Sequence, residues 1–110
     1  MNTEYQVIRN SDQLRKAVEL LSAQPAIGLD TETTDLEPHT ARLRLIQLAT
    51  PAGVSIIDLE AFANGDLAKH DDVRSLRELL AAPRPIKIAH NAKFDAKFIK
   101  HKLGVDLGAP

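Results

Sequence analysis

The chain has 110 residues, of which 44% are hydrophobic and 26% charged, and its formal net charge is −1. These values are typical of one globular domain, so we treat residues 1–110 as a single domain. The absence of cysteine excludes disulfide scaffolds, thiol catalysis and cysteine-ligated zinc. No window approaches the ~20 apolar residues of a membrane-spanning helix and no signal peptide is visible, so we expect a cytoplasmic protein with no membrane partner.

The first half of the chain predicts a strand, a helix and then three further strands. Residues 5–8 form a short apolar-rich strand, and Asn10, Ser11 or Asp12 can cap the helix that follows. Its apolar positions recur at helical spacing as far as Pro25; they are Leu14, Ala17, Val18 and Leu21. Strands are then expected over 26–32, 43–50 and 54–59, the last two joined into a β-hairpin by the turn at 51–53.

The second half predicts a helix, a strand and a final helix. Residues 64–72 are polar and are expected to form a loop that ends on Asp71 and Asp72, the acids that open the next helix. That helix is marked by Val73, Leu76, Leu79 and Leu80; a strand over 86–89 and a helix over 92–103 follow. This order predicts an α/β fold, in which helices flank a mixed sheet and an edge or face of the sheet stays uncovered.

Charge is unevenly distributed along the chain. Residues 86–102 contain five lysines and one acid, a local charge of +4 that leaves −5 for the remainder. A basic stripe beside acidic residues favours a phosphate-bearing ligand, and a solvated helix face is the alternative. The histidines His39, His70 and His101 lie in polar surroundings and are expected at the surface.

Two acidic side chains, Asp30 and Glu32, end the strand predicted over 26–32. Residues i and i+2 of a strand point to the same face, so the two carboxylates lie side by side where a buried strand meets solvent. Like charges at that spacing repel, and a divalent cation with oxygen ligands is the usual compensation. The alternative is a solvated strand end that binds nothing.

A third carboxylate, Asp95, lies one turn into the helix predicted over 92–103. It shares a helix face with Phe98 and Ile99, which we expect to pack inward. Because burying an unpaired charge is costly, Asp95 either pairs with a lysine or serves a metal. Asn91, just before this helix, is placed to cap it.

Together the three carboxylates describe an oxygen-only site of the kind that holds Mg²⁺ or Mn²⁺. Such sites polarise phosphate oxygens and generate hydroxide from bound water, while basic side chains nearby hold a phosphate backbone. The combination suggests hydrolysis of phosphodiester bonds.

Two regions of the sequence resemble the first two motifs of DEDD-type 3′–5′ exonucleases. The first region reads GLDTETTDL at 28–36 and RLRLIQLAT at 42–50, and the second reads HNAKFD at 90–95. The resemblance extends from Tyr5 to about Val105 and is strongest to the proofreading exonuclease domain of bacterial family A DNA polymerases, then to ribonuclease D. It implies a ribonuclease-H-like fold and removal of nucleotides from the 3′ end of single-stranded DNA or RNA, with DNA favoured.

The resemblance also implies a two-metal site of Mg²⁺ or Mn²⁺. Asp30 and Glu32 would hold the cation bearing the nucleophilic water, Asp30 would bridge both cations, and Asp95 would support the second. The family's third motif, a Tyr or His four residues before a fourth carboxylate, has no counterpart in these 110 residues. The fourth metal ligand is therefore absent from this chain.

Three further residues correspond to substrate-binding positions of the family, and one lysine is a candidate from its charge alone. Thr33 and Leu36 match positions that meet the terminal nucleotide, with Leu36 against its base. Asn91 is expected to order the site near the substrate strand. Lys93 is expected to touch phosphate, and simple solvation is the alternative for this lysine.

Without the third motif we expect the chain to be the N-terminal, C-terminally incomplete portion of an exonuclease domain, weak or inactive by itself. Its partners would then include the remaining exonuclease segment or a polymerase domain. A non-catalytic nucleic-acid-binding or structural remnant is the alternative function. Self-association is a third possibility, because an unfinished sheet can borrow surface from a second copy.

Overall fold

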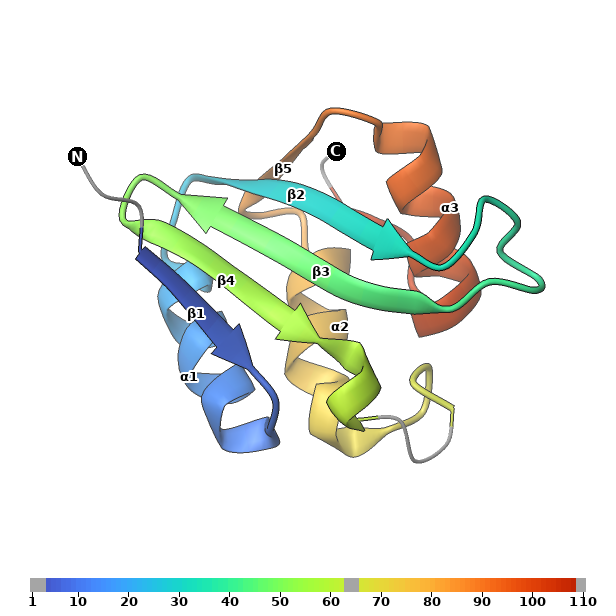
Figure 1. The fold of residues 1–110 in the computed structure, drawn as a ribbon. Helices are drawn as coiled ribbons and strands as arrows, with labels where there is room; N and C mark the ends of the chain where they lie inside the picture. Colours follow the sequence, from blue (N-terminus) through green and yellow to red (C-terminus); the bar gives the residue numbers. More distant parts are fainter. Residues whose placement is uncertain (1–3, 63–65, 109–110) are drawn as a thin grey trace.

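A five-stranded mixed sheet forms the centre of the molecule (Figure 1). The computed structural model describes residues 4–62 and 66–108. The strands are β1 (Glu4–Ile8), β2 (Ala26–Thr33), β3 (Leu43–Thr50), β4 (Gly53–Asp58) and β5 (Ile86–Ala89). The helices are α1 (Ser11–Ser22), α2 (Arg74–Ala81) and α3 (Ala92–Leu103), with 3₁₀ turns at Leu59–Phe62 and Asp71–Val73. The predicted order of elements is confirmed.

The strands lie in the order β1-β4-β3-β2-β5. β2, β3 and β4 pair antiparallel as a meander, which confirms the hairpin expected over 43–59. β1 pairs parallel with β4 at one edge, and β5 pairs parallel with β2 at the other. The α/β prediction of a mixed sheet is therefore confirmed, with β2 placed between β3 and β5.

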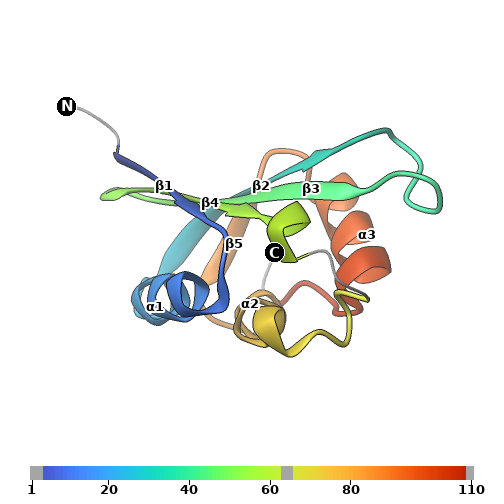
Figure 2. The ribbon, with the colours of Figure 1, turned by 60° about the horizontal axis from the view of Figure 1, so that its bottom comes forward.

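The three helices lie on the same side of the sheet (Figure 2). Side chains that alternate along the strands fill the space between, among them the fully buried Ile8, Ile27, Ile46, Leu48 and Ile57. Within the two described ranges, no helix is both long and apolar enough to cross a bilayer. One apolar core between a sheet and a single helix layer thus stabilises the described part of the chain.

The opposite face of the sheet carries no helix in the described ranges (Figure 2). Tyr5, Val54, Ala49, Gly28 and Ile88 follow one another across the five strands in direct register. Tyr5 and Ile88 are more than 60% exposed at the two edges of this row. The expectation of an uncovered edge or face is therefore met. We call this helix-free side of the sheet the open face.

Helix α1 begins as the sequence predicts. The side chain of Asn10 accepts a hydrogen bond from the backbone N–H of Gln13 at 2.9 Å, which satisfies one of the free donors of the first turn. Leu14, Ala17 and Leu21 are buried against the sheet. The helix ends at Ser22, three residues before Pro25, which has no backbone N–H to donate to a helical hydrogen bond.

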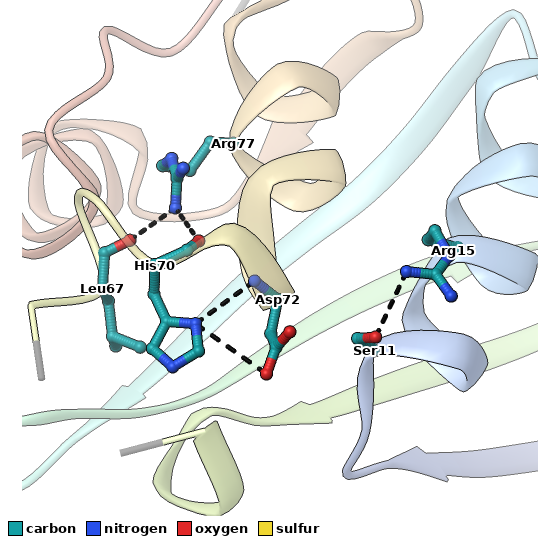
Figure 3. Close-up of polar contacts among 6 residues, drawn as sticks. All are labelled: Ser11, Arg15, Leu67, His70, Asp72 and Arg77. Atoms are coloured by element: carbon teal, nitrogen blue, oxygen red, sulfur yellow. Dashed lines mark hydrogen bonds and ion pairs between the residues drawn. The ribbon is translucent and has the colours of Figure 1, made fainter. Parts of the chain in front are cut away.

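The segment before α2 differs from its predicted polar loop. Residues 64 and 65 of that loop lie outside the described residues, and Asp71–Val73 form a 3₁₀ turn. His70 caps this turn, because its Nδ1 accepts from the backbone N–H of Asp72 at 3.2 Å (Figure 3). Its side chain is 23% exposed, so this histidine is half-buried and not fully exposed as a surface histidine would be. A ring nitrogen takes the capping role because Asp71 and Asp72 already lie inside the turn.

Arg77 closes the same segment from helix α2 (Figure 3). Its Nη1 donates to the carbonyl oxygens of Leu67 and His70 at 2.7 and 2.6 Å. On α1, in the same view, Arg15 donates to Ser11 one turn earlier at 3.2 Å. The Arg77 contacts satisfy backbone carbonyls that regular secondary structure leaves free.

Lys87 lies in the core and not in the basic stripe to which the sequence assigns it. It is 1% exposed on the helix-facing side of β5, and its Nζ donates to the carbonyl of Ala82 at the end of α2. Burial lowers the pKa of this ammonium below its usual 10.5, because desolvation penalises the charged form. Strand alternation decides the outcome, since Ile86 and Ile88 face the other way.

We expect the buried ammonium of Lys87 to make stability rise with pH. Between its lowered pKa and 10.5 the unfolded chain binds more protons than the native protein, so the free energy of unfolding increases with pH across that window. Urea denaturation of Lys87→Met from pH 7 to 10 should show a smaller increase than wild type. Lys16→Met, on the exposed side of α1, is the control, and an equal increase in Lys87→Met would contradict this account.

Candidate active site

Side-chain alternation along β2 directs its acidic residues away from the helix layer. Ile27 and Leu29 are buried under the helices, whereas Asp30 and Glu32 are exposed on the open face. Asp30 pairs with Gln47 of β3 across the sheet, and Glu32 pairs with Leu45. The structure therefore places both predicted carboxylates at the end of a central strand, on the side free of helices.

Thr31, between these two acids, points the other way and meets Asp95. Its Oγ1 donates a hydrogen bond to Oδ1 of Asp95 at 2.5 Å. Asp95 lies in the first turn of α3 and is only 2% exposed. Of the two alternatives for Asp95, pairing with a lysine is not observed, because in the described part of the chain Asp95 forms no ion pair. Thr31 therefore solvates this buried carboxylate.

The environment of Asp95 raises the pKa of its carboxyl group above the usual value. Burial is the main cause, because the charged form loses its hydration. The negative charge of Asp30 raises the pKa further, while the hydrogen bond from Thr31 lowers it. Asp30 and Asp95 therefore lie near enough to repel, although they come from opposite sides of the sheet.

Glu32 takes part in a separate ion-pair network. Its Oε1 lies 3.8 Å from Nη1 of Arg44, and Arg44 Nε and Arg42 Nη2 lie 3.4 and 3.3 Å from Glu60. In residues 4–62 and 66–108, no three acidic or histidine side chains gather closely enough to hold a metal ion. The structure thus brings Asp30 toward Asp95 and leaves Glu32 with arginine.

The loop after β2 presents its residues at the surface. Thr33 Oγ1 donates to the carbonyl of Asp35 at 2.8 Å. Thr34 and Arg42 exchange two hydrogen bonds of 3.0 and 2.8 Å, which close the base of the loop. Leu36 is 76% exposed at its tip, an unusual position for a large apolar side chain. The loop therefore offers one apolar side chain to solvent beside the acidic strand end.

A groove on the open face joins Asp30 to the start of α3. Its lining is polar near Asp30 and apolar along the sheet: Gly28, Leu29, Asp30, Gln47, Ala49, Val54, Ile88, Ala89, His90 and Asn91. Gly28 keeps the floor low, since a Cβ there would lie 3.3 Å from Cβ of Ala49. The groove contains two of the residues selected from the sequence, Asp30 and Asn91.

Asn91 and Lys93 have different surroundings from each other. Asn91 is the N-cap residue of α3, as predicted, but its side chain makes no capping hydrogen bond. Its backbone carbonyl accepts the N–H of Asp95 at 3.0 Å, and Asn91 is one of the residues that line the groove. Lys93 is exposed on the outer side of α3.

Thr31 and Arg44 have roles that were not predicted from the sequence. Alternation along the strand was a usable signal for Thr31: the side chain between two open-face acids must face the helices, where Asp95 is located. Arg44 had no comparable signal, because its partners Glu32 and Glu60 depend on how β3 pairs with β2 and on the turn after β4.

Comparisons with known proteins agree with this architecture. Residues 5–109 match the family model described as 3′–5′ exonuclease. DNA polymerase I of Aquifex aeolicus (strain VF5) is 31% identical over 96 residues, which make up 87% of this chain and 14% of that protein.

Solved structures of RNase D share the fold. Escherichia coli RNase D, described as an exoribonuclease involved in structured RNA processing, superposes with a TM-score of 0.79 and 29% identity over 98% of this chain and 26% of that one. Trypanosoma brucei RNase D in complex with RNA U12 gives a TM-score of 0.82 and 21% identity, over 98% and 37%. The chain therefore spans a minor part of each of these proteins, and the exonuclease-like fold expected from the two motifs is confirmed.

The raised pKa of Asp95 makes a stability prediction. Between 3.8 and its raised pKa the native protein binds more protons than the unfolded chain, so the free energy of unfolding falls as pH rises through that window. Asp95→Asn should remove this fall in urea titrations, whereas Asp12→Asn on the surface of α1 should keep it. If the free energy of unfolding of Asp95→Asn fell with pH as much as that of wild type, burial of this carboxyl group would not be the cause of the fall.

Thr31→Val should lower the free energy of unfolding by ~1.5–3 kcal/mol at neutral pH, because the buried carboxylate loses its hydrogen-bond donor.

Proposed function

Because the chain belongs to the 3′–5′ exonuclease family, we propose that it takes part in removing nucleotides from the 3′ end of a single nucleic-acid strand. The observation that carries this proposal is the proximity of Asp30 and Asp95, two carboxylates without a basic partner among the described residues. A divalent cation would relieve the repulsion between them and the burial cost of Asp95. Cation binding would therefore explain why two carboxylates lie close together although their repulsion destabilises the folded protein.

The donor set suits Mg²⁺ or Mn²⁺, since carboxylate oxygens are the ligands these cations prefer. We assign Asp30, Asp95 and Glu32 as the residues that would hold a pair of cations. Glu32 must turn from Arg44, 3.8 Å away, to join the other two. Bound cations supply Lewis acidity and a water of lowered pKa.

Hydrolysis at this site would release a nucleoside 5′-monophosphate. A water oxygen forms the new bond to the terminal phosphorus, and the bond from phosphorus to the 3′ oxygen of the preceding nucleotide breaks. That oxygen takes up a proton and becomes the new 3′ hydroxyl group. Asp30 and Asp95 would hold, from the two sides of the strand end, the cations that attract the reacting phosphate.

The residues around the carboxylates would position the strand. Leu36, 76% exposed at the loop tip, would pack against the terminal base, and Thr33 at the start of the same loop would approach its sugar. Asn91 would donate its amide within the groove, and Lys93 would contact phosphate. Each of these side chains lies on an element next to the acidic strand end.

DNA is the favoured substrate in this proposal. The supporting observation is the 31% identity to a DNA polymerase I over 87% of the chain, against 29% to an RNase D structure. The two values are close, and both sugars therefore belong in the experiment.

A second candidate function is nucleic-acid binding without catalysis. It is favoured by the absence of any metal-competent group of three acidic or histidine side chains within residues 4–62 and 66–108. In that case Asp30 and Asp95 would be retained without turnover.

Cleavage of 5′-labelled single-stranded DNA and RNA with Mn²⁺ tests the proposal. We expect a ladder that shortens from the 3′ end and disappears without metal. Asp30→Ala and Asp95→Asn should reduce the rate at least ~100-fold, since loss even of residues that support metal ligands costs 10–100-fold. Asp12→Ala, an exposed acid on α1, is the matched control and should retain the rate. A metal-dependent ladder of equal rate in Asp30→Ala would contradict the assigned site, and no cleavage by the folded wild type would favour the second candidate.

A further inference from the structure

The outer side of α3 carries a row of basic side chains that leads away from the candidate site. Lys93, Lys97 and His101 follow at intervals of four residues and lie on the outer side of the helix. In the described part of the chain no carboxylate lies within ion-pair distance of Lys93 or Lys97. Lys100 differs, because its Nζ lies 3.2 Å from Asp106. The row, defined here as Lys93, Lys97 and His101, therefore keeps an excess of positive charge.

Acidic groups beside this row are already engaged by other cations or donors. Glu37 accepts hydrogen bonds from the backbone N–H of His39 at 3.0 Å and from its ring at 2.5 Å. These bonds lower the pKa of Glu37, and the charge of Lys97 adds a smaller effect in the same direction. Glu60, further along, lies 3.3 and 3.4 Å from Arg42 and Arg44. Glu37 and Glu60 thus have closer partners than the row, and neither forms an ion pair with Lys93 or Lys97.

The row continues directly into the candidate site. The rings of His39 and His101 meet edge to face, with centroids 4.4 Å apart, and this contact holds the loop after β2 against α3. Figures 1 and 2 both show that loop beside the helix. The same loop presents Leu36, and the same helix begins beside Asp95. The row, the loop that carries Leu36 and the strand end that carries Asp30 therefore lie next to one another.

We propose that Lys93, Lys97 and His101, with His39 beside them, form a track for the phosphates of the substrate strand on the 5′ side of the reacting nucleotide. This inference rests on the proposed function, because the 3′ end of that strand fixes where the track starts. From Lys93 to His101 the helix rises ~12 Å, against an advance of ~3.4 Å per phosphate along one strand of a duplex. The track therefore serves several phosphates, by charge and without reading bases.

A single nucleic-acid strand is favoured over other polyanions because the row is narrow. An anionic membrane would need a broad basic surface, whereas this row is one helix side bordered by Glu37 and Glu60. A nucleic-acid strand needs only a line of cations that ends at the carboxylates. Binding affinity that increases with the length of the oligonucleotide distinguishes such a strand from a membrane surface.

Binding without metal tests the track separately from catalysis. The probes are 5′-fluorescein oligothymidylates of 3 and 12 nucleotides and a 12-nucleotide oligouridylate, followed by fluorescence anisotropy in EDTA at several salt concentrations. Lys93→Glu/Lys97→Glu should weaken binding of both 12-mers ~10-fold or more, with a smaller effect on the 3-mer. Lys93→Gln/Lys97→Gln should reduce the slope of log K against log salt by ~1.4, at ~0.7 for each phosphate that the lysines no longer neutralise.

The control is Lys16→Glu/Lys69→Glu, which makes the same charge change at two exposed lysines on other elements. Weakening equal to that of the α3 pair would mean a net-charge effect and would overturn the track, as would unchanged affinity in the α3 variants. Loss of binding to phosphatidylserine vesicles, with oligonucleotide binding kept, would also overturn it. Wild-type binding through the row without any metal-dependent cleavage would refute the proposed exonuclease activity and leave the track in place.

Discussion

The alternation of side chains along β2 is the constraint on which the core and the candidate site both depend. Ile27, Leu29 and Thr31 face the helix layer, while Asp30 and Glu32 face the open side of the sheet. The first set anchors the strand in the core and ends on a hydroxyl that solvates Asp95. The second set places carboxylates in solvent. A shift of one residue in the pairing of β2 would bury both acids and expose the core residues.

Asp30 and Asp95 show the physical conflict that results. They lie near each other around the end of β2, one exposed and one 2% exposed, and the Thr31 hydroxyl donates a hydrogen bond to the buried carboxylate. Burial and mutual repulsion both favour the protonated form of Asp95, which raises its pKa. An arrangement that costs stability in the free protein is expected where a cation is to be bound, because the cation reverses the sign of the local potential. The same strand end opens onto the groove, the Leu36 loop and the basic side of α3.

Much of the fold was predictable, because the local sequence pattern is sufficient to determine the type of several helices and strands. Alternation defined β2 and β3, helical spacing defined α1, and Gly104 ended α3 in a left-handed conformation with φ of 72°. Lys87 and His70 were not predictable in this way. The position of Lys87 in the core depends on which face of β5 meets the helices, and the role of His70 depends on a turn fixed by Arg77. The Glu32–Arg44 contact likewise arises from strand pairing distant in sequence.

Binding of Mn²⁺ to the protein alone tests most directly whether Asp30 and Asp95 form a cation site. Electron paramagnetic resonance of free Mn²⁺ can be titrated with wild type, Asp30→Asn, Asp95→Asn and the surface control Asp12→Asn. The account predicts saturable Mn²⁺ binding by wild type and by Asp12→Asn. It predicts loss of this binding in both site variants, because each variant removes one of the two negative charges that would hold the cation. Equal uptake by all four proteins would contradict it, since the cation would then be bound elsewhere.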